Sequence, residues 1–193
     1  MKNILILFAH PAYQRSRANK QLIEAVSDLE SVTVHDLYEA YPDFFIDVPS
    51  EQQRLLEHDV IVFHHPFYWY SSPALLKEWQ DLVLEHGFAY GQGGTALHGK
   101  ALMSAVTTGG SAEAYTASGT NRYEMHEFLR PFEQTAHLCG MDYLPPYVAH
   151  DFHVNRDIEQ HKNHARQYRD LIVGIRDEKI ADSTEETGGH SDA

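Results

Sequence analysis

The sequence predicts an α/β fold in which a doubly wound sheet of five parallel strands carries helices on both faces. Two features lead to this prediction. Short, almost uninterrupted apolar runs recur along the chain, as expected of parallel strands buried on both faces, and segments with the apolar period of a helix separate them. At 193 residues the chain suits one substantial domain, which we expect to span residues 1–180.

The first part of the chain supplies two strands. Asn3–Ala9 is an apolar run that predicts a central strand, and a helical period begins near Ser16 after a polar loop. Val32–Leu37 alternates apolar with polar residues, which predicts an edge strand. Tyr38–Gln53 is expected to be a long irregular connection, and connections of this length tend to be functional or to contact a partner. Glu51–Glu57 predicts a short helix.

The third strand leads into the stretch around which we expect the ligand site to be built. Val60–Phe63 is a continuous apolar run, and an aromatic loop follows it. Ser72 is expected to be the N-cap of the next helix, with Pro73 at the first helical position. The loop then lies at the carboxyl edge of the sheet, where open α/β sheets bind ligands.

The remaining elements complete the alternation of strands and helices. Pro131 is expected to kink or restart its helix, and Pro145-Pro146 marks the fifth strand as an edge strand. Composition predicts a disordered tail over residues 181–193. In chain order, these elements are a strand over Lys100–Val106, a helix within Asn121–Leu138, a strand over Gly140–Val148 and a helix over Glu159–Ile175.

Charge and composition narrow the classes of function and location. The formal net charge is −13, so long-range repulsion opposes binding to nucleic acid and direct adhesion to an anionic membrane. No apolar run approaches the roughly 20 residues of a membrane span, and the chain start lacks the features of a signal peptide. We therefore expect a cytoplasmic protein that reaches the inner membrane only through a protein partner. The single cysteine, Cys139, lies in apolar surroundings that favour an inert buried thiol.

The 14 histidines do not form a recognisable metal motif. His64 and His65 are adjacent at a strand end, and His161 and His164 share a helix at a spacing that could bind a metal. Neither pair is accompanied by paired cysteines or a carboxylate cluster. We therefore expect no metal site.

The loop after the first strand has the features of a phosphate site without the usual glycine motifs. Backbone N–H groups at a helix start can hold a phosphate against the positive end of the helix dipole, helped here by the Ser16 hydroxyl and the Asn19 amide. Arg15, Arg17 and Lys20 add positive charge to an acidic chain. A solvated basic turn with an ordinary N-cap at Ser16 explains the same residues equally well.

Two further loops follow strands at the same sheet edge. Phe67–Tyr70 is a run of four aromatic residues that cannot all face inward, so we favour a wall for a flat ligand over a packed core corner. Gly109 and Gly110 follow the fourth strand, where glycines let the backbone approach a ligand closely or adopt positive φ. Turn chemistry alone also explains such a glycine pair.

Together the three loops suit a phosphorylated ring system. They would supply a phosphate cradle, an aromatic wall and a glycine-lined floor. The flavodoxin-like strand order 2-1-3-4-5 places a flavin mononucleotide (FMN) where the first and third strands diverge. Because the sequence shows no Ser-His-Asp order and no paired acidic motif, a bound cofactor is expected to carry the chemistry.

Several motifs resemble those of the flavodoxin-like NAD(P)H:quinone oxidoreductases. They are His10-Pro11, Ser16-Arg17-Ala18-Asn19-Lys20, Pro66-Phe67-Tyr68-Trp69-Tyr70-Ser71, the run from Gly93 to Lys100, and Thr107-Thr108-Gly109-Gly110. The resemblance covers roughly Lys2 to Ile175. Within this family, the segments Val34–Tyr38, Tyr41–Phe44, Asn121–Tyr123 and Leu129–Glu133 are most similar to the ancillary proteins of glutathione-gated potassium efflux systems.

The resemblance implies a homodimer that binds FMN or FAD and transfers two electrons from NAD(P)H to a quinone. The implied cofactor-binding residues are His10, Ser16, Arg17, Ala18 and Asn19 for the phosphate or ribityl chain, Phe67, Tyr68, Trp69 and Tyr70 for the isoalloxazine edge through backbone groups, and Thr107, Thr108, Gly109 and Gly110 for the other side of the ring. Tyr115 matches a family tyrosine near the flavin carbonyl, and Asn121 stands where the mammalian quinone reductases have a histidine. These two are the candidate catalytic residues.

Three functions are compatible with these motifs. The first is an FMN-dependent quinone reductase that also docks on a potassium efflux transporter. The second is a regulatory subunit of such a transporter, in which the flavin site is occupied and turnover is incidental. The third, a one-electron carrier of the flavodoxin type, fits less well because the sequence lacks the Thr/Ser-Gly phosphate loop typical of those carriers.

Overall fold

The computed structural model describes residues 1–152 and 158–178, so the predicted tail over residues 181–193 lies outside this part of the chain. Its centre is a parallel sheet of order β2-β1-β3-β4-β5, with β6 also paired to β4. The strands are β1 Ile4–Phe8, β2 Val32–Asp36, β3 Val60–Pro66, β4 Ala101–Thr107, β5 Asp142–Tyr143 and β6 Tyr147–Ala149. The predicted strand order, and with it the predicted fold class, is confirmed.

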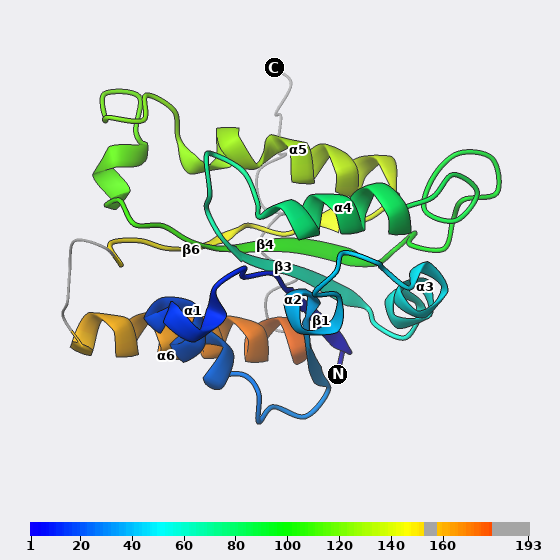
Figure 1. The fold of residues 1–193 in the computed structure, drawn as a ribbon, viewed down its shortest axis with the longest axis horizontal. Helices are drawn as coiled ribbons and strands as arrows, with labels where there is room; N and C mark the ends of the chain where they lie inside the picture. The colour runs from blue at the N-terminus through cyan, green and yellow to red at the C-terminus, as the bar shows by residue number, and fades with distance from the viewer. Residues whose placement is uncertain (153–157, 179–193) are drawn as a thin grey trace, which may run out of the picture.

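Helices cover both faces of the sheet, as Figure 1 shows. α4 and α5 lie on one face, and α1 and α6 pack together on the other. The described helices are α1 Arg17–Glu24, α2 Leu37–Ala40, α3 Val48–Leu56, α4 Ala74–Val83, α5 Met125–Leu138 and α6 Ile158–Arg176, with short 3-10 turns η1 Tyr13–Arg15 and η2 Ala112–Tyr115.

Each face of the sheet buries its own hydrophobic core, which explains the uninterrupted apolar runs of the central strands. Leu5 and Leu7 of β1 point into the core under α4 and α5, whereas Ile4 and Ile6 point into the core under α1 and α6. A strand buried on both faces needs apolar residues at every position. The apolar face predicted for the final helix is part of the second core, where Tyr168 of α6 is fully buried.

The connection after β2 is more regular than predicted. The Asp36 side chain caps α2 by accepting from the backbone N–H groups of Tyr38 and Glu39, and Asp47 caps α3 by accepting from Ser50 N. Both carboxylates satisfy N–H groups that a helix start leaves unpaired. α2 therefore forms within the stretch expected to be irregular, and the helix predicted over Glu51–Glu57 begins three residues earlier, at Val48. The connection lacks helix only over residues 41–47.

The start of α4 lies one residue later than predicted. Pro73, not Ser72, occupies the N-cap position, with ψ of 149° and no side-chain cap, and α4 begins at Ala74. Pro73 lacks a backbone N–H, so it leaves no donor unpaired there.

Proline also divides the predicted fifth strand. β5 and β6 both pair with β4 in parallel, and Pro145 and Pro146 lie between them. Proline cannot donate a ladder hydrogen bond, so pairing with β4 stops after Tyr143 and resumes at Tyr147. Pro131, in contrast, does not restart α5, which begins at Met125 with a capping box from Glu124 and continues to Leu138.

Candidate functional site

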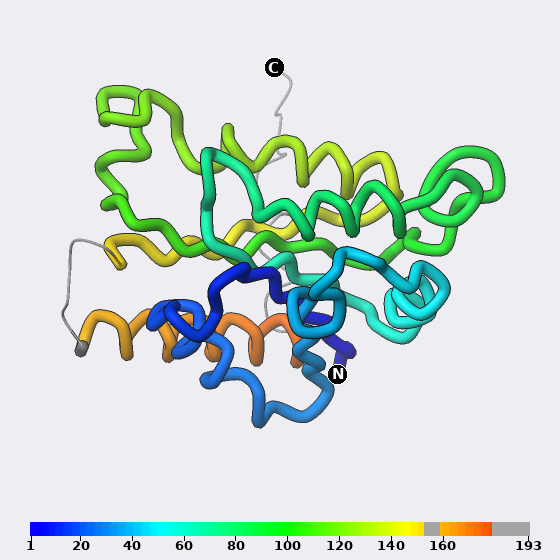
Figure 2. The backbone as a smooth tube through the Cα atoms, viewed as in Figure 1, coloured from blue at the N-terminus to red at the C-terminus, as the bar shows by residue number. Residues whose placement is uncertain are grey.

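The loops that follow β1, β3 and β4 lie at one end of the molecule, on the left in Figure 2, and residues 150–152, directly after β6, lie at the same end. This end is the carboxyl edge of the parallel sheet. The residues proposed from the sequence as cofactor-binding or catalytic belong to these loops, to the last position of β4 (Thr107), to the first turn of α1, or to η2 and the segment after it. The fold therefore brings together residues separated by up to about a hundred positions, and their roles in binding stay predictions.

Asn19 is the polar centre that links these loops from inside the protein. It is 2% exposed. Its Nδ2 donates to Ser16 Oγ and to Thr107 Oγ1, both at 3.0 Å, and its Oδ1 lies 3.1 Å from His64 Nε2. Because the amide is fully used inside the chain, Asn19 is placed to fix the Ser16 and Thr107 loops relative to each other.

His64 is a buried, neutral member of the Asn19 hydrogen-bond network. Its ring is fully buried on β3, and its Nδ1 lies 3.0 Å from the Tyr168 hydroxyl of α6. Burial, followed by the nearby His65 and His10, lowers the pKa of His64 to about 3. A neutral imidazole can donate with one nitrogen and accept with the other, which suits one partner on each side.

The start of α1 offers a polar and cationic surface. The Ser16 hydroxyl caps the helix by accepting from Asn19 N at 3.2 Å, so its own proton remains available for an acceptor such as a phosphate oxygen. Arg15 and Arg17 are exposed beside it, and Ala18 is buried against the core. A cavity of about 600 Å³ begins here, lined by His10, Pro11, Ala12, Tyr13, Gln14, Arg15, Asp36, Tyr38 and Glu39.

His10 connects this loop with the aromatic loop. Its Nδ1 accepts from Ala12 N at 3.0 Å, which leaves the proton of the neutral ring on Nε2 as a donor. Burial lowers the pKa of His10, so the neutral form is favoured. Its ring lies edge-on to Tyr68 at a centroid separation of 6.2 Å.

The aromatic loop after β3 raises three of its four rings into solvent. Tyr68, Trp69 and Tyr70 are 40%, 93% and 52% exposed, while Phe67 is half-buried. Trp69 and Tyr70 have φ of 49° and 64°, and reciprocal backbone hydrogen bonds between Tyr68 and Ser71 close the turn. Left-handed backbone at two successive large residues is uncommon and marks a strained turn. Only Phe67 fits the alternative of a core corner.

The loop after β4 is tied to β6 on one side. Thr108 N donates to Ala149 O at 2.9 Å, and the Thr108 hydroxyl donates to Gly110 O at 2.8 Å. A Cβ built on Gly110 would lie 3.5 Å from the Tyr115 ring, an ordinary contact, and Gly110 does not have positive φ. Neither crowding inside the chain nor backbone geometry requires glycine at position 110, whereas close approach of a ligand would.

Tyr115 and Asn121 both lie against the aromatic loop. The Tyr115 ring packs edge-on to Phe67 at 5.8 Å, and burial raises the pKa of Tyr115. Asn121 Oδ1 accepts a hydrogen bond from the Tyr70 hydroxyl at 3.3 Å. The two candidate catalytic residues thus lie on the side of the site opposite α1, next to the predicted ring wall.

Sequence reasoning missed two histidines at this site. His64 was considered only as a possible metal ligand, and His150, directly after β6, was not considered at all. His150 Nδ1 lies 3.0 Å from Thr108 Oγ1, and its ring lies 5.6 Å from that of Tyr115. The available signal was its position after a strand at the same sheet edge. Among the described residues, no group of three or more His, Cys, Asp or Glu is arranged to hold a metal ion.

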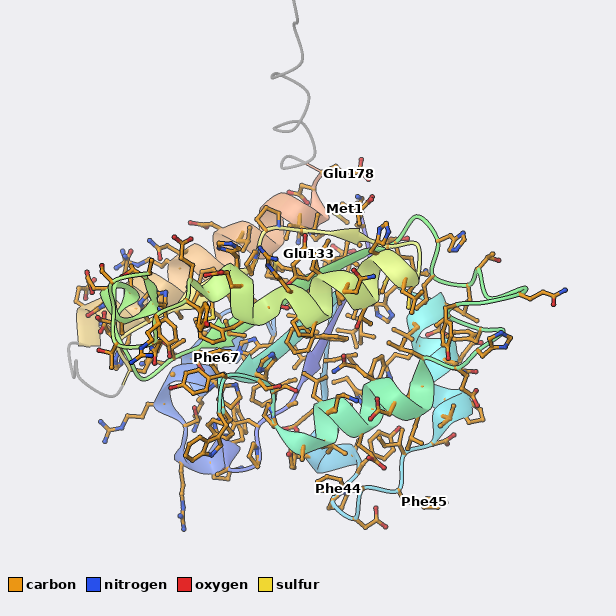
Figure 3. All side chains as sticks on the ribbon, turned by 90° about the horizontal axis from the view of Figure 1, so that it is seen from above. Met1, Phe44, Phe45, Phe67, Glu133 and Glu178 are labelled. Atoms are coloured by element: carbon orange, nitrogen blue, oxygen red, sulfur yellow. The ribbon has the colours of Figure 1, made fainter. Side chains whose placement is uncertain are left out.

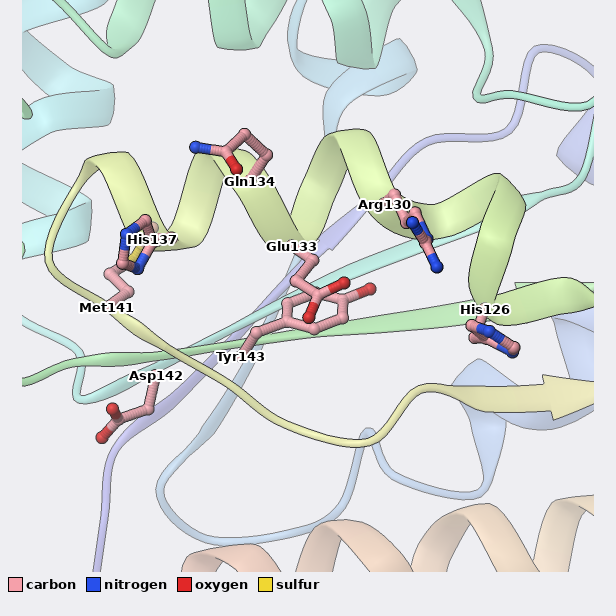
Figure 4. A pocket seen from close by; sticks show the side chains of 8 residues that line it. All are labelled: His126, Arg130, Glu133, Gln134, His137, Met141, Asp142 and Tyr143. Atoms are coloured by element: carbon pink, nitrogen blue, oxygen red, sulfur yellow. The ribbon is translucent and has the colours of Figure 1, made fainter.

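A second hollow lies away from this edge. A groove of about 730 Å³ runs along the outer side of α5 towards β5 (Figure 4), and the side chains that line it are those of His126, Arg130, Glu133, Gln134, His137, Met141, Asp142 and Tyr143. None of the residues proposed from the sequence lines it. Its mixed charges offer neither an apolar wall nor a cationic cluster for a phosphorylated ring.

The types of residue at the sheet edge suit the phosphate and the flat ring of a flavin mononucleotide. A phosphate would meet the N-terminus of α1 with Ser16 and Arg17, and a flat ring would meet the exposed aromatic turn. None of the helices in the described ranges has the length and apolar character needed to cross a bilayer.

Comparison with known proteins agrees with this arrangement. Residues 2–172 match a protein family described as having a flavodoxin-like fold. The chain is 56% identical over 147 residues to the glutathione-regulated potassium-efflux system ancillary protein KefG of Pectobacterium atrosepticum. The aligned region covers 76% of this chain and 80% of that protein.

The chain is also similar to solved structures of proteins whose names refer to different activities. A thermophilic tryptophan halogenase from Streptomycin violaceusniger has 46% identity and a TM-score of 0.85, covering 88% of this chain and 98% of its own. General stress protein 14 of Treponema denticola, in complex with FMN, has 38% identity and a TM-score of 0.85, with 90% and 99% covered. An NADPH-quinone reductase from P. pentosaceus has 34% identity and a TM-score of 0.80, with 89% and 97% covered. The chain belongs to the family of flavodoxin-like proteins that these relatives share.

Proposed function

We propose that this protein binds FMN at the carboxyl edge of its sheet and acts as an NAD(P)H:quinone oxidoreductase. The observation that carries the proposal is the meeting, at one edge, of a cationic helix start, an exposed aromatic turn and a glycine, Gly110, that neither crowding inside the chain nor backbone geometry requires. Its FMN-complexed relative at 38% identity and a relative called an NADPH-quinone reductase at 34% support it.

The chain's own residues divide the binding work among the loops. Ser16 and Arg17, with the free N–H groups of the first turn of α1, would hold the phosphate, and His10 would donate from Nε2. Backbone groups of the turn at Phe67–Tyr70 would hold one edge of the ring. Thr107–Gly110 would border its other side, held in place by Asn19 and by Ala149.

Bound FMN supplies two-electron chemistry, and the chain supplies orientation and charge stabilisation. Each quinone reduced to a hydroquinone consumes one hydride from NAD(P)H and one proton from solution. Tyr115, whose raised pKa keeps its hydroxyl protonated at neutral pH, can donate a hydrogen bond to negative charge that develops in the reaction. Asn121 can donate only a neutral hydrogen bond.

A second candidate function is a flavin-occupied regulatory subunit of a potassium efflux transporter, with incidental turnover. The 56% identity to a protein called an ancillary protein of such a system favours it. Either function is compatible with a homodimer and with a cytoplasmic protein docked on a transporter. Phe44 and Phe45, which lie together at the periphery away from Phe67 in Figure 3, supply exposed apolar surface for such contacts.

A steady-state assay separates the two functions. FMN-loaded protein is mixed with NADPH or NADH, and nicotinamide oxidation is followed before and after addition of a soluble quinone. The reductase predicts quinone-dependent oxidation that requires FMN and yields one hydroquinone per nicotinamide consumed. Retained FMN with no quinone-dependent oxidation by either nicotinamide would favour the regulatory subunit.

A further inference from the structure

The reaction proposed above takes up a proton, yet the residue at position 121 cannot supply one. Position 121 is an asparagine, and its amide does not titrate near neutral pH. The chain does, however, place a histidine at the same site from a different element. His150 follows β6 and lies against both the Tyr115 ring and the loop after β4.

The hydrogen bonds around Thr108 determine which nitrogen of His150 carries the proton. Thr108 Oγ1 has one proton, which it donates to Gly110 O at 2.8 Å. It must therefore accept from His150 Nδ1, which lies 3.0 Å away. The neutral ring then has its lone pair on Nε2, so Nε2 is the atom that takes up or releases a proton.

His150 also communicates with Tyr115. The two rings are tilted by 39° at a centroid separation of 5.6 Å, so a positive charge on the imidazole acts directly on the tyrosine. Burial raises the pKa of Tyr115, and the interaction with the Thr108 side chain opposes this rise. The same Thr108 side chain contacts His150. Protonation of His150 therefore changes how readily Tyr115 donates to a negative charge.

Several charged groups face His150 and shape its titration. Burial lowers the pKa of His150, while Asp151 on its own segment and Glu113 in η2 oppose this. His164 of α6 is close enough that the two histidines repel each other when both are protonated. The loop after β4 adds no ionisable side chain, because Thr107 to Gly110 are threonines and glycines.

We propose that His150 is the proton-titrating positioning residue of this site, acting through Thr108 and Tyr115. The inference rests on the proposed reductase function. The two can be tested separately, because the coupling between His150 and Tyr115 is a property of the protein without FMN.

The first test therefore uses the protein without FMN. Tyrosine and histidine side chains are isotopically labelled, and the Tyr115 and His150 NMR signals are followed from pH 8 to pH 5. We expect the Tyr115 signal to shift with the same midpoint as His150. His150→Asn retains a donor at the position of Nδ1 but cannot titrate, so it should remove this shift. His137→Asn, which changes an exposed histidine of α5, is the matched control. An unchanged Tyr115 titration in His150→Asn would overturn the coupling.

The second test measures flavin reduction by NAD(P)H at the same pH values. We expect the wild-type rate to change with the His150 midpoint found by NMR, and His150→Asn to show no such step and to fall by about a hundredfold, the low end for a positioned proton donor. His137→Asn should match the wild type. A rate profile identical in wild type and His150→Asn would overturn the proposal. Absence of flavin reduction in the wild type would instead refute the reductase function. In that case, the midpoint potential of bound FMN would be measured against pH in the wild type and in His150→Asn, and it would show whether the substitution removes a proton-linked step.

Discussion

The Tyr70 hydroxyl donates a hydrogen bond to Asn121 Oδ1 across 3.3 Å, and this contact joins two segments that are 51 positions apart. Tyr70 ends the aromatic turn after β3, and Asn121 lies between η2 and α5. The Tyr70 ring is also stacked on Phe128 of α5, with a centroid separation of 5.2 Å. Asn121 is thus directed at the aromatic turn, and a titratable group at position 121 would act at the same surface.

Substitution of Asn121 by histidine should therefore add a proton-linked step. We expect Asn121→His to raise the rate of flavin reduction and to introduce a pH dependence between about 6 and 8, in addition to the lower-pH step assigned to His150. Stopped-flow reduction by NADH across this range checks it. A profile for Asn121→His that overlays the wild type would show that position 121 does not reach the reacting groups.

Loss of the Tyr115 hydroxyl should slow the same step without unfolding the protein. The ring of Tyr115 is packed among Phe67 and Phe128, and phenylalanine preserves that packing. If Tyr115 is the main donor, Tyr115→Phe should reduce the rate roughly ten- to a thousandfold. FMN affinity should change far less than the rate. A rate within twofold of the wild type would remove Tyr115 from the catalytic role.

The buried amide of Asn19 should matter for both stability and binding. Asn19→Ala removes the buried partner of His64 Nε2 and of Thr107 Oγ1, so we expect a loss of about 1–3 kcal/mol in the free energy of unfolding. FMN retention should fall as well, because the two loops lose their link. Asn163→Ala, on the exposed side of α6, is the control and should change neither. Urea denaturation and gel filtration with FMN measure the two effects, and equal stability of both variants would contradict this account.

The backbone of the aromatic turn, more than the indole of Trp69, should determine FMN retention. Proline fixes φ near −65°, which is incompatible with the φ of 49° at Trp69, whereas glycine adopts positive φ without strain. We expect Trp69→Pro to lose FMN and Trp69→Gly to retain it, with both proteins folded because the position is 93% exposed. If Trp69→Gly loses FMN as completely as Trp69→Pro, then the side chain and not the backbone is the binding element.

Acid should destabilise the protein before its carboxylates titrate. Burial lowers the pKa of His64 to about 3 and that of His65 to about 4, so between pH 6.5 and 4.5 the unfolded state binds more protons than the folded state. Each histidine then costs about 1.4 kcal/mol of unfolding free energy per pH unit as the pH falls. Glu51 does not contribute there: burial favours a higher pKa, but His35, Trp79 and Tyr41 lower the pKa of Glu51 to about 2.

Urea denaturation at several pH values checks this slope, and His65→Leu isolates one histidine. This variant should lose about 1.4 kcal/mol per pH unit from the slope. A slope unchanged from the wild type would mean that His65 is protonated in the folded state.

The fold was predictable because its signals are local and strong. A strand such as β1, which is buried on both faces, is recognisable in the sequence as a continuous apolar run. The errors arose where a single side chain decides the outcome. The Asp36 cap starts a helix that periodicity did not reveal, and the Asp47 cap starts α3 three residues before the predicted Glu51. Pro145-Pro146 divides the predicted fifth strand into β5 and β6.

The site was predictable as a set of loops but not as a network. Motifs marked Ser16, Asn19 and Thr107, yet only the fold shows that the Asn19 amide joins the other two. His150 carries no local motif, and its relation to Tyr115 depends on how β6 pairs with β4, a contact between distant parts of the chain. Such pairings cannot be derived from the spacing of residues.

The central claim is best tested by one anaerobic redox cycle of the protein after FMN addition and desalting. We predict that about one FMN per chain is retained, that NADH or NADPH bleaches its absorption, and that a quinone restores the oxidised spectrum with one hydroquinone formed per flavin. Retained flavin that neither nicotinamide bleaches, or a desalted protein without flavin, would contradict the claim.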